Sequence, residues 1–503
     1  AIPDLASFTP VPWEPTVARF ACDITVDGEE WPYDPRTILR RQLAVAREPM
    51  RYDRVGDRVE FDPERLLDAV FELIHRCARE AHVDAHASAV IAVTGQAESL
   101  VLVDGDDRPV IPGISWMDER SGEQAREIAE RFDPVAAFAV TGEPEPVPTW
   151  PATKLRWLRQ HRPEALAAAQ RVLMVKDFVL LRLTGLAVGE ETTRGFTYLY
   201  DVQRREYWGE MLEFCGVRPS AMPEVVPAGA DLGPVLPAMA DRLPPAASWT
   251  VNAGALDHFA GMVGTGSYRP GAVSASAGTV LALSMLAPGW RFDPGMLVSF
   301  HAGLRPGETV LFSCADSGGV TLDWFQAEVL AGALAYDDLE AELIVRDHDG
   351  SPLFLPFLTG VNPPDFNAAA RGAFLDLQLR HDRVDLAFAV MEGVAHLLRS
   401  NLDDLARHGH AADSIVSAGG GTASAFWNQL KADACGIEVR VPDESEAASR
   451  GTAVLALAAA GVIGSIEHTD ALSTPTERVF VPAADRGDRF DAYRRSIDRL
   501  FGP

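Results

Sequence analysis

Residues 414–441 constrain the fold of this 503-residue chain more than any other segment. The segment starts with a short apolar run, continues through three glycines at 419–421, and then has the composition of a helix, 425–435, that ends at Gly436. The residues after Gly436 alternate between apolar and polar, as they do in a half-buried strand. A strand, a glycine turn, a helix and a second strand in this order predict an α/β architecture.

The glycine turn at 419–421 has two interpretations. Between the end of a strand and the start of a helix, it would expose backbone N–H groups that bind anionic phosphate together with the helix dipole. Three glycines can also simply allow a helix and a strand to pack closely. The spacing matches neither Gly-x-Gly-x-x-Gly nor Gly-x-x-x-x-Gly-Lys-Ser/Thr, which disfavours a dinucleotide-binding fold and a P-loop.

A second informative segment, residues 251–286, holds one carboxylate and one glycine turn. Asp257 follows a run of small residues, and Gly278 with Thr279 separates two β-prone runs, as in a tight hairpin. Taken alone, such an Asp is usually a turn or N-cap residue, and a Gly-Thr pair is usually only a turn. Both settings also suit phosphoryl transfer, in which a carboxylate accepts the proton of the attacking hydroxyl.

Length, charge and cysteine content limit the class of protein. A chain of 503 residues is expected to form two domains. Its formal net charge of −27 disfavours nucleic acid or an anionic membrane surface as a main partner, and an anionic ligand would need backbone amides and a divalent cation. The five scattered cysteines favour a reducing cytoplasm over a disulfide scaffold. The longest apolar run, residues 452–463, is too short to cross a bilayer.

Strand-like and helix-like segments are mixed along the whole chain. A strand is predicted at 90–93 and a hairpin from the apolar runs 100–103 and 110–111, and helices are predicted at 122–131, 152–160, 172–183, 320–330, 382–407, 425–435 and 449–460, the last of these as the final helix. The Pro- and Ala-rich segment 227–247 is predicted to be a linker. We therefore expect two α/β domains, 1–247 and 248–503, with a cleft between them.

The motifs of the chain, taken in order from about residue 45 to residue 501, resemble those of the FGGY family of carbohydrate kinases. Residues 94–98 are similar to the family's Gly-Gln loop, residues 115–120 to its Trp-x-Asp-x-Arg segment, and residues 149–161 to its first signature, except at Thr149. Residues 254–258 are similar to a Gly-Gly-Gly-Asp-Gln motif, with His258 in place of Gln. The second signature has Asp376 where Gly is customary.

This resemblance implies a fold, an activity and a set of site residues. Family members have two ribonuclease-H-like, actin-like ATPase domains with an active-site cleft between them, and they use ATP and Mg²⁺ to phosphorylate a sugar or polyol. Here the first domain would bind the sugar, the second would bind the nucleotide, and Asp257 would be the general base. The expected sugar contacts are Gln96, Glu98, Trp116, Asp118, Thr149, Trp150 and His258, and the expected ATP contacts are Gly278, Thr279, Gly319, Gly420, Gly421 and Ser424. The enzyme would be cytoplasmic, and a homodimer is compatible with the resemblance.

The family's first phosphate hairpin, Asp-x-Gly-Thr, has no clear counterpart before Gln42. The nearest segment is 22–28, where Asp23 would be the metal ligand and Thr25 occupies the place of the glycine, so that its side chain would crowd the phosphate. Either the chain shown lacks the hairpin, or this member handles phosphate differently, or it has lost kinase activity. The last case makes a catalytically silent sugar- or nucleotide-binding protein the alternative, although such a protein has no need of a carboxylate at Asp257. An actin-like ATPase would leave residues 96–98 and 116–120 unexplained.

Overall fold

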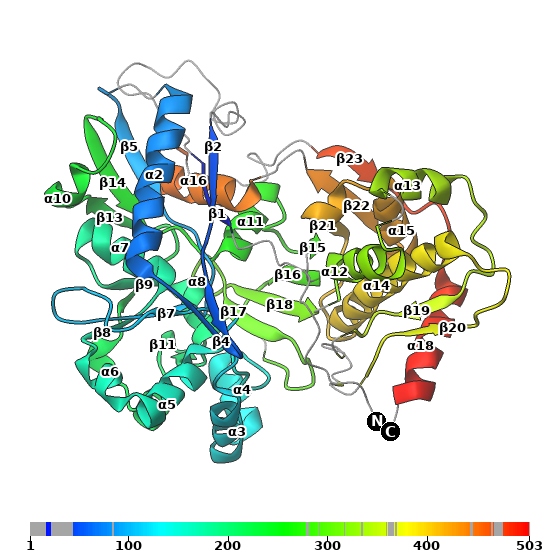
Figure 1. The fold of residues 1–503 in the computed structure, drawn as a ribbon, viewed down its shortest axis with the longest axis horizontal. Coiled ribbons are helices and arrows are strands. Elements are labelled where there is room, and N and C mark those ends of the chain that lie inside the picture. The colour runs from blue at the N-terminus through cyan, green and yellow to red at the C-terminus, as the bar shows by residue number, and fades with distance from the viewer. Residues whose placement is uncertain are drawn as a thin grey trace.

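The computed structural model of the chain consists of two lobes (Figure 1). It describes residues 17–21, 44–82, 85–277, 281–290, 292–315, 317–332, 335–358, 360, 367, 370–442, 446–463, 466 and 476–501. We define the first lobe as the described residues up to 265 together with helix α16 (Ala447–Ala459). The second lobe comprises the described residues 272–442 and 476–501.

The first lobe combines short sheets with helices. Its strands are β1 (Val17–Ala21), β2 (Val45–Pro49), β3 (Asp53–Val55), β4 (Arg58–Phe61), β5 (Ser88–Ala92), β6 (Leu100–Val103), β7 (Gly113–Ile114), β8 (Arg171–Met174), β9 (Val188–Glu190), β10 (Tyr200–Asp201), β11 (Glu206–Tyr207), β12 (Glu224–Val226), β13 (Asp231–Pro234) and β14 (Ser248–Asn252). Its helical elements are α2 (Pro63–Ala81), α3 (Gly122–Arg131), α4 (Pro134–Thr141), α5 (Pro151–His161), α6 (Pro163–Ala168), α7 (Val175–Thr184), α8 (Glu191–Arg194), η2 (Gly195–Thr197), α9 (Gly209–Cys215), η3 (Pro219–Ala221), α10 (Pro237–Ala240) and α11 (Asp257–Thr265).

The second lobe is built on a seven-stranded sheet in the order β17-β18-β16-β15-β21-β22-β23. Its strands are β15 (Ala272–Ala277), β16 (Leu281–Ala287), β17 (Ser299–Ala302), β18 (Thr309–Ala315), β19 (Leu353–Leu355), β20 (Ala373–Leu375), β21 (Ser414–Ala418), β22 (Glu438–Pro442) and β23 (Thr476–Phe480). Its helical elements are α12 (Gly319–Trp324), the π-helical turn η4 (Phe325–Val329), α13 (Tyr336–Ile344), α14 (Arg383–Arg407), η5 (Gly420–Thr422), α15 (Ala425–Cys435) and α18 (Gly487–Phe501).

Strand pairing brings three chain segments to one edge of this sheet. β15 and β16 form an antiparallel hairpin in which Ala277 pairs with Leu281, so the predicted hairpin is confirmed. β15 is parallel to β21, and β18 is antiparallel to β16 and hence parallel to β15. The carboxyl ends of β15, β18 and β21 therefore point to the same edge.

A smaller sheet in the first lobe has the order β13-β14-β5, with β14 parallel to β5. The prediction that residues 227–247 are a linker is wrong, because strand β13 and helix α10 lie within them and β13 pairs with β14. β13 is a short edge strand that ends at Pro234, and proline is tolerated in edge strands. The domain boundary expected between residues 247 and 248 falls inside this sheet.

Helices α11 and α16 tie the C-terminal half of the chain to the first lobe, where Figure 1 shows them side by side. A Cβ atom added at Gly264 would lie 1.9 Å from the carbonyl oxygen of Ala447, and one added at Gly451 would lie 1.7 Å from that of Ala260. Only glycine allows the two backbones to approach this closely. After β22 the chain therefore returns to the first lobe and packs against the helix that begins at Asp257.

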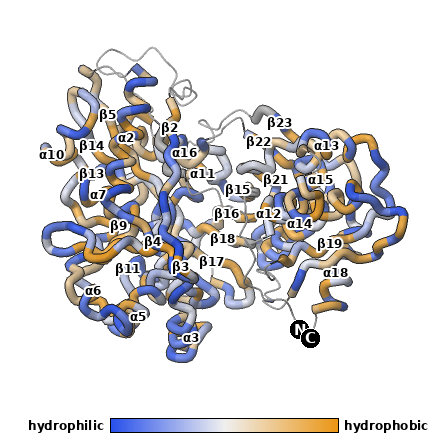
Figure 2. Tube along the Cα trace, viewed as in Figure 1, coloured by the Kyte–Doolittle hydropathy of each residue, from blue (hydrophilic) through white to orange (hydrophobic). Residues whose placement is uncertain are grey.

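Helix α14 confirms the helix predicted at 382–407. The carboxylate of Asp382 accepts hydrogen bonds from the N–H groups of Val384 and Asp385 and so caps the helix. Most of α14 is buried, and it is largely hydrophobic in Figure 2, whereas α3 at the edge of the first lobe is largely hydrophilic. The cap and the apolar stripe are both local features, which is why a helix at 382–407 could be predicted.

Of the other predicted helices, three are confirmed and two differ from the prediction. The helices expected at 122–131, 152–160 and 425–435 are confirmed to within one residue at each end. The helix expected at 172–183 is instead a strand followed by a helix, because residues 171–174 pair with β6 and the Asp177 carboxylate accepts the N–H of Met174 at 2.9 Å. The helix near 320–330 becomes π-helical at Phe325, and α18 rather than α16 is the last helix.

Candidate active site

Two loops from distant parts of the chain meet beyond the carboxyl ends of β5 and β14. Because these strands are parallel, the segments that follow them, residues 93–98 and 253–257, leave the sheet side by side. The loops form a β-bridge, and Thr94 Oγ1 donates a hydrogen bond to the carbonyl oxygen of Ala255 at 2.9 Å. The loop expected to contact the sugar therefore lies next to the carboxylate expected to act as the base.

Asp257 is the first residue of helix α11 and is partly exposed. Its Oδ1 accepts the backbone N–H of His258 at 2.7 Å, and the His258 side chain is exposed. The partial positive charge at a helix N-terminus stabilises a carboxylate in this position. The fold thus presents a carboxylate, held by the start of a helix, to a ligand.

The Asp257 loop requires glycine at position 254. The φ angle of Gly254 is +56°, in the left-handed region, and an added Cβ would lie 2.1 Å from the carbonyl oxygen of Val93. Any side chain would both strain the backbone and push the loop away from the end of β5. This is the physical reason for the glycine in the motif at 254–258.

Glu98 combines backbone strain with an altered acidity. Its φ angle of 70° is rare for a residue other than glycine. The buried Lys154 ammonium donates hydrogen bonds to the carbonyl oxygens of Glu98 at 3.1 Å and Ser115 at 2.8 Å. Burial raises the pKa of Glu98 to about 7, although Lys154 and a hydrogen bond from Thr149 oppose the rise, and the charge of Asp257 adds to it. Strain of this kind is common at ligand-binding positions.

Gln96 presents an amide oxygen that lacks a partner. Its Nε2 donates to Ser99 Oγ at 2.8 Å, and the same oxygen accepts the backbone N–H of Trp116 at 3.0 Å. The Oε1 atom of Gln96 is buried and has no hydrogen-bond partner among the described residues. Leaving such an oxygen unpaired is unfavourable, so a ligand hydroxyl that donates to it would be stabilised. Trp116 is half-buried beside this group.

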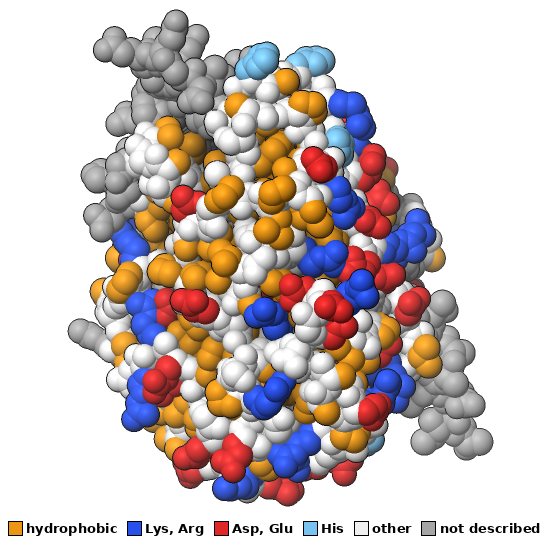
Figure 3. Space-filling model, turned by 90° about the vertical axis from the view of Figure 1, so that its left-hand side faces the viewer, with side chains coloured by type: hydrophobic (Ala, Val, Ile, Leu, Met, Phe, Trp, Pro, Cys, Tyr) orange, Lys and Arg blue, Asp and Glu red, His pale blue; other side chains and the backbone are white. Residues whose placement is uncertain are grey.

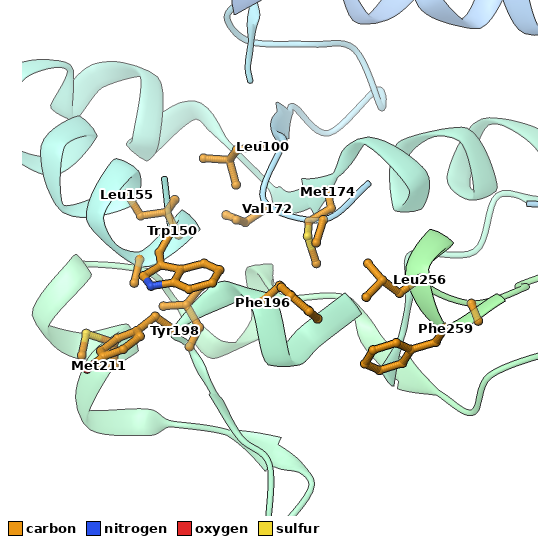
Figure 4. Packing of buried hydrophobic residues seen from close by; sticks show 14 of the residues in the cluster. Leu100, Trp150, Leu155, Val172, Met174, Phe196, Tyr198, Met211, Leu256 and Phe259 are labelled. Atoms are coloured by element: carbon orange, nitrogen blue, oxygen red, sulfur yellow. The ribbon is translucent and has the colours of Figure 1, made fainter. Parts of the chain in front are cut away.

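Asp118 and Trp150 have different surroundings from the other predicted sugar contacts. Asp118 is completely buried, and its carboxylate accepts hydrogen bonds from Val59 N–H at 2.6 Å and from the Arg120 guanidinium at 2.6 and 2.8 Å. Trp150 points into the hydrophobic core of the first lobe, near Phe196 (Figure 4). Both side chains are therefore buried in the structure, unlike those of Asp257 and His258.

Two buried titratable groups beside this site were missed by the sequence analysis. Glu143 follows helix α4 and His301 lies in β17; Glu143 Oε1 is 3.4 Å from His301 Nε2, and Glu143 Oε2 accepts a hydrogen bond from Ser299 Oγ at 2.6 Å. Burial raises the pKa of Glu143 well above its usual value, and the charge of Glu98 adds to the rise. Burial also lowers the pKa of His301 to about 3. The sequence held no local signal for this pair, because its members lie on different lobes.

The residues expected to bind ATP lie at the shared edge of the second-lobe sheet. Gly420 and Gly421 belong to η5, which starts two residues after the end of β21, and a Cβ at Gly420 would have no atom of the described residues within 4 Å beyond its chain neighbours. Ser424 is the N-cap of α15, and its Oγ accepts a backbone N–H of the first turn at 3.0 Å. Gly319 begins α12, shortly after β18. The glycine turn is therefore exposed and open, as a site for phosphate would be.

Three predicted residues, Gly278, Thr279 and Asp23, lie outside the described residues. In the sequence, Gly278 and Thr279 follow Ala277, the last residue of β15. Among the residues that the structure does describe, no group of three or more His, Cys, Asp or Glu side chains is arranged to hold a metal ion.

The outer surface of the first lobe has mixed character. Figure 3 shows acidic and basic side chains interspersed on this face, with hydrophobic side chains between them. In the part of the chain that the structure covers, no helix is both long and apolar enough to span a bilayer.

Two α/β lobes, a carboxylate at a helix start beside polar side chains, and an exposed glycine turn at a sheet edge are the features that a phosphotransferase acting on a hydroxyl group would need. Comparison with known proteins gives the family. Residues 42–264 match the N-terminal domain, and residues 274–460 the C-terminal domain, of the FGGY family of carbohydrate kinases. The chain belongs to this family and is a carbohydrate kinase, which phosphorylates a sugar or polyol.

Similar proteins support this assignment over most of the chain. A xylulose kinase of Escherichia coli (strain K12) is 30% identical over 414 residues, which cover 82% of this chain and 84% of that protein. A glycerol kinase of Thermococcus gammatolerans is 27% identical over 465 residues, covering 90% and 92%. The alternative of a catalytically silent binding protein is not favoured, because these relatives are kinases.

Solved structures confirm the predicted fold class. A structure described as a xyloylose kinase from Brucella ovis superposes with a TM-score of 0.82 at 27% identity, covering 92% of this chain and 93% of the other. The glycerol kinase of Plasmodium falciparum with ADP has a TM-score of 0.83 at 17% identity, covering 92% and 94%, and shows the shared fold alone. The fold is α/β with two domains of the ribonuclease-H-like, actin-like ATPase class.

Proposed function

We propose that Asp257 is the general base of this carbohydrate kinase and that Mg-ATP is its phosphoryl donor. The observation that carries the proposal is the contact between the loop at 93–98 and the loop that ends at Asp257. It puts one partly exposed carboxylate beside the polar groups of Gln96 and Glu98. A sugar hydroxyl bound by those groups would lie within reach of Asp257.

In the proposed reaction, the acceptor hydroxyl oxygen attacks the γ-phosphorus of ATP. A bond forms between that oxygen and phosphorus, the bond from phosphorus to the bridging oxygen of ADP breaks, and Asp257 accepts the hydroxyl proton. Hydroxyls are weak nucleophiles, so removal of the proton as the bond forms lowers the barrier. The remaining acceleration comes from positioning and from neutralisation of phosphate charge.

Recognition of the acceptor is assigned to Gln96, Glu98 and Thr149. His258 and Trp116 are proposed as further contacts at the edge of the sugar site. Two groups can each bind a hydroxyl group. One is Oε1 of Gln96, which has no partner among the described residues, and the other is the carboxyl group of Glu98, whose backbone is strained. Asp118 and Trp150 would act indirectly, by holding Arg120 and the core behind the loop. The relatives named xylulose kinase make a ketopentose the first acceptor to test.

The nucleotide is assigned to the edge of the second-lobe sheet. Backbone amides of Gly420 and Gly421 and the start of helix α15 at Ser424 are suited to phosphate or ribose, and Gly319 begins α12 after strand β18 of the same sheet. The assignment of Gly278 and Thr279 to the nucleotide rests on the sequence motif alone. Mg²⁺ usually keeps several waters and is held largely by the phosphates of its nucleotide. Asp23 is the protein carboxylate that the sequence offers for it.

The domain limits and the oligomeric state also remain proposals. Because β14 belongs to the sheet of β5, we propose that the two domains meet within residues 265–273. A homodimer is a prediction that light scattering of the purified protein would test.

The general base is tested with Asp257→Asn. Loss of a general base lowers turnover by roughly a hundredfold or more, while calorimetry should show ATP and ketopentose affinities within a few-fold of wild type, since Asn has nearly the same shape. Asp488→Asn, at the exposed start of α18, is the matched control and should keep full turnover. Near-normal turnover of Asp257→Asn would end the assignment.

A further inference from the structure

Lys176, Glu190 and Thr192 form a chain of buried polar contacts behind the Asp257 loop. Lys176 Nζ lies 2.9 Å from Glu190 Oε2, and both side chains have 0% exposure. Glu190 also accepts hydrogen bonds from the backbone N–H of Thr192 at 2.6 Å and from its hydroxyl at 2.8 Å. We call these three residues the clamp.

The clamp forms hydrogen bonds with the loop at 253–257 on both sides of Gly254. Lys176 Nζ donates a hydrogen bond to the carbonyl oxygen of Ala253 at 3.1 Å. The hydroxyl oxygen of Thr192 accepts the backbone N–H of Leu256, the residue before Asp257, at 2.9 Å. The loop is thus tied to helix α7 and to the start of helix α8, two elements of the first lobe that lie outside the loop itself.

The chemistry of the clamp suits a positioning role. Burial of a Lys-Glu pair is costly, and apolar side chains of similar volume often stabilise a fold as well or better. Hydrogen bonds from a charged donor are, however, shorter and stronger than neutral ones, and they fix geometry. Here the Lys176 ammonium donates one of its hydrogen bonds to the carbonyl oxygen of the loop. The Glu190 carboxylate accepts a hydrogen bond from the Thr192 hydroxyl and so orients its oxygen, which accepts the N–H of Leu256.

We propose that Lys176, Glu190 and Thr192 are positioning residues that hold the Asp257 carboxylate at the acceptor hydroxyl. The inference rests on the proposed role of Asp257 as the base. The clamp acts through the backbone at residues 253 and 256, and a shift of about 1 Å at a reacting group can cost around a hundredfold in rate. Loss of a clamp contact should therefore lower kcat and leave both KM values nearly unchanged.

The first test compares two adjacent threonines. Thr192→Val removes the hydroxyl that accepts the Leu256 N–H. Thr193→Val is the matched control, since Thr193 is equally buried. Its hydroxyl donates to the Glu190 carbonyl at 2.7 Å and accepts a hydrogen bond from Arg194 Nη2 at 3.3 Å, and among the described residues neither partner belongs to the loop at 253–257. We expect Thr192→Val to lower kcat about tenfold or more with less than threefold change in either KM, and Thr193→Val to retain kcat. Equal losses of kcat in the two variants would overturn the proposal.

A conservative replacement of Thr192 distinguishes the hydrogen bond of its hydroxyl from the packing of its methyl group. Thr192→Ser keeps the hydroxyl and should restore kcat to within about threefold of wild type, whereas failure of this rescue contradicts the clamp. If Thr192→Val does not fold, Thr192→Ala removes the same hydroxyl without steric demand and carries the same expectation.

Combination with Asp257→Asn distinguishes failure of the clamp from failure of the base. If the clamp acts through Asp257, adding Thr192→Val to Asp257→Asn lowers the residual kcat no further. A full additional tenfold loss would overturn the clamp but leave the base assignment intact. Normal turnover of Asp257→Asn alone would overturn the base, and the clamp with it.

Discussion

The proposed acceptor side and the proposed nucleotide side of this kinase differ in how their backbone is held and how exposed it is. Around Asp257 the loops are held by buried charges, Lys154 and the Lys176–Glu190 pair, and Glu98 has a strained backbone. At the sheet edge of the second lobe, the turn at Gly420 is exposed, and within the described part of the chain no neighbouring atom lies within 4 Å of the position that a Cβ at Gly420 would take.

This contrast agrees with the chemistry of the two proposed ligands, a sugar and ATP. The hydroxyl groups of a sugar are neutral and directional, so their recognition needs side chains with fixed orientation and paired partners. A triphosphate carries high charge, and backbone amides at a helix start can bind it without side-chain order. We therefore expect substitutions on the acceptor side to change folding and turnover together, and those at the glycine turn to change nucleotide affinity alone.

The largest expected effect is from Gly254→Ala. Its methyl group would lie 2.1 Å from the Val93 carbonyl in a left-handed backbone, and together these penalties should lower the free energy of unfolding by about 3 kcal/mol or more. Urea denaturation measures the change. Gly420→Ala is the control on the open side and should change stability by less than about 1 kcal/mol. Equal stability of the two variants would remove the contrast.

Gly420→Val should act on the nucleotide alone. The turn has space for the new side chain in the free protein, but the side chain would occupy the place of the proposed phosphates. We expect the Kd for ATP to rise about tenfold or more, equivalent to about 1.4 kcal/mol, with sugar affinity and melting temperature near wild type. Gly209→Val, at another open glycine, is the control. Unchanged ATP affinity in calorimetry would contradict this placement.

Glu98 should make sugar binding depend on pH. Its pKa is raised to about 7 by burial, so the carboxylate fraction increases from about a tenth at pH 6 to about nine tenths at pH 8. If the carboxylate accepts a sugar hydroxyl, the KM for the sugar should fall by up to about tenfold over this interval. Glu98→Gln should flatten the profile.

The identity of the sugar tests the same residue in a second way. Glu98→Ala should reduce kcat/KM unevenly across ketoses, aldoses and polyols, most for those with the hydroxyl that Glu98 contacts. Background ATP hydrolysis should change little. A uniform loss over all acceptors, or no loss, would show that Glu98 does not contact the sugar.

The smallest effect is expected for Ser424→Ala at the start of α15. Loss of an N-cap hydrogen bond costs about 1 kcal/mol, which should appear as faster hydrogen exchange in the first turn of α15 with little change in turnover. Ser424→Asn should retain the cap. Loss of turnover in the Ala variant at saturating ATP would show that the nucleotide side is as tightly organised as the acceptor side.

The glycine motifs show which parts of the candidate site could be predicted from the sequence. It placed Asp257 next to a small-residue run and a glycine turn at the end of β21, and the structure has both. It noted Asp376 where the family has glycine, and the structure gives that residue a φ of 59°, a left-handed conformation that Asp tolerates. In contrast, it treated Asp118 and Trp150 as sugar contacts, and their complete or nearly complete burial became evident only from the fold.

The sequence by itself determined several local elements, such as α3, α14 and α15, and the family of this protein. Glycine ends such as Gly436 and apolar periodicity such as that of residues 382–407 act within one or two turns, so they can be recognised in a linear chain. Only the tertiary structure decided which groups surround Asp257. Lys176 reaches Ala253, and Glu143 meets His301 from the other lobe. Such contacts depend on sheet pairing and lobe packing, which leave no periodic trace in the sequence.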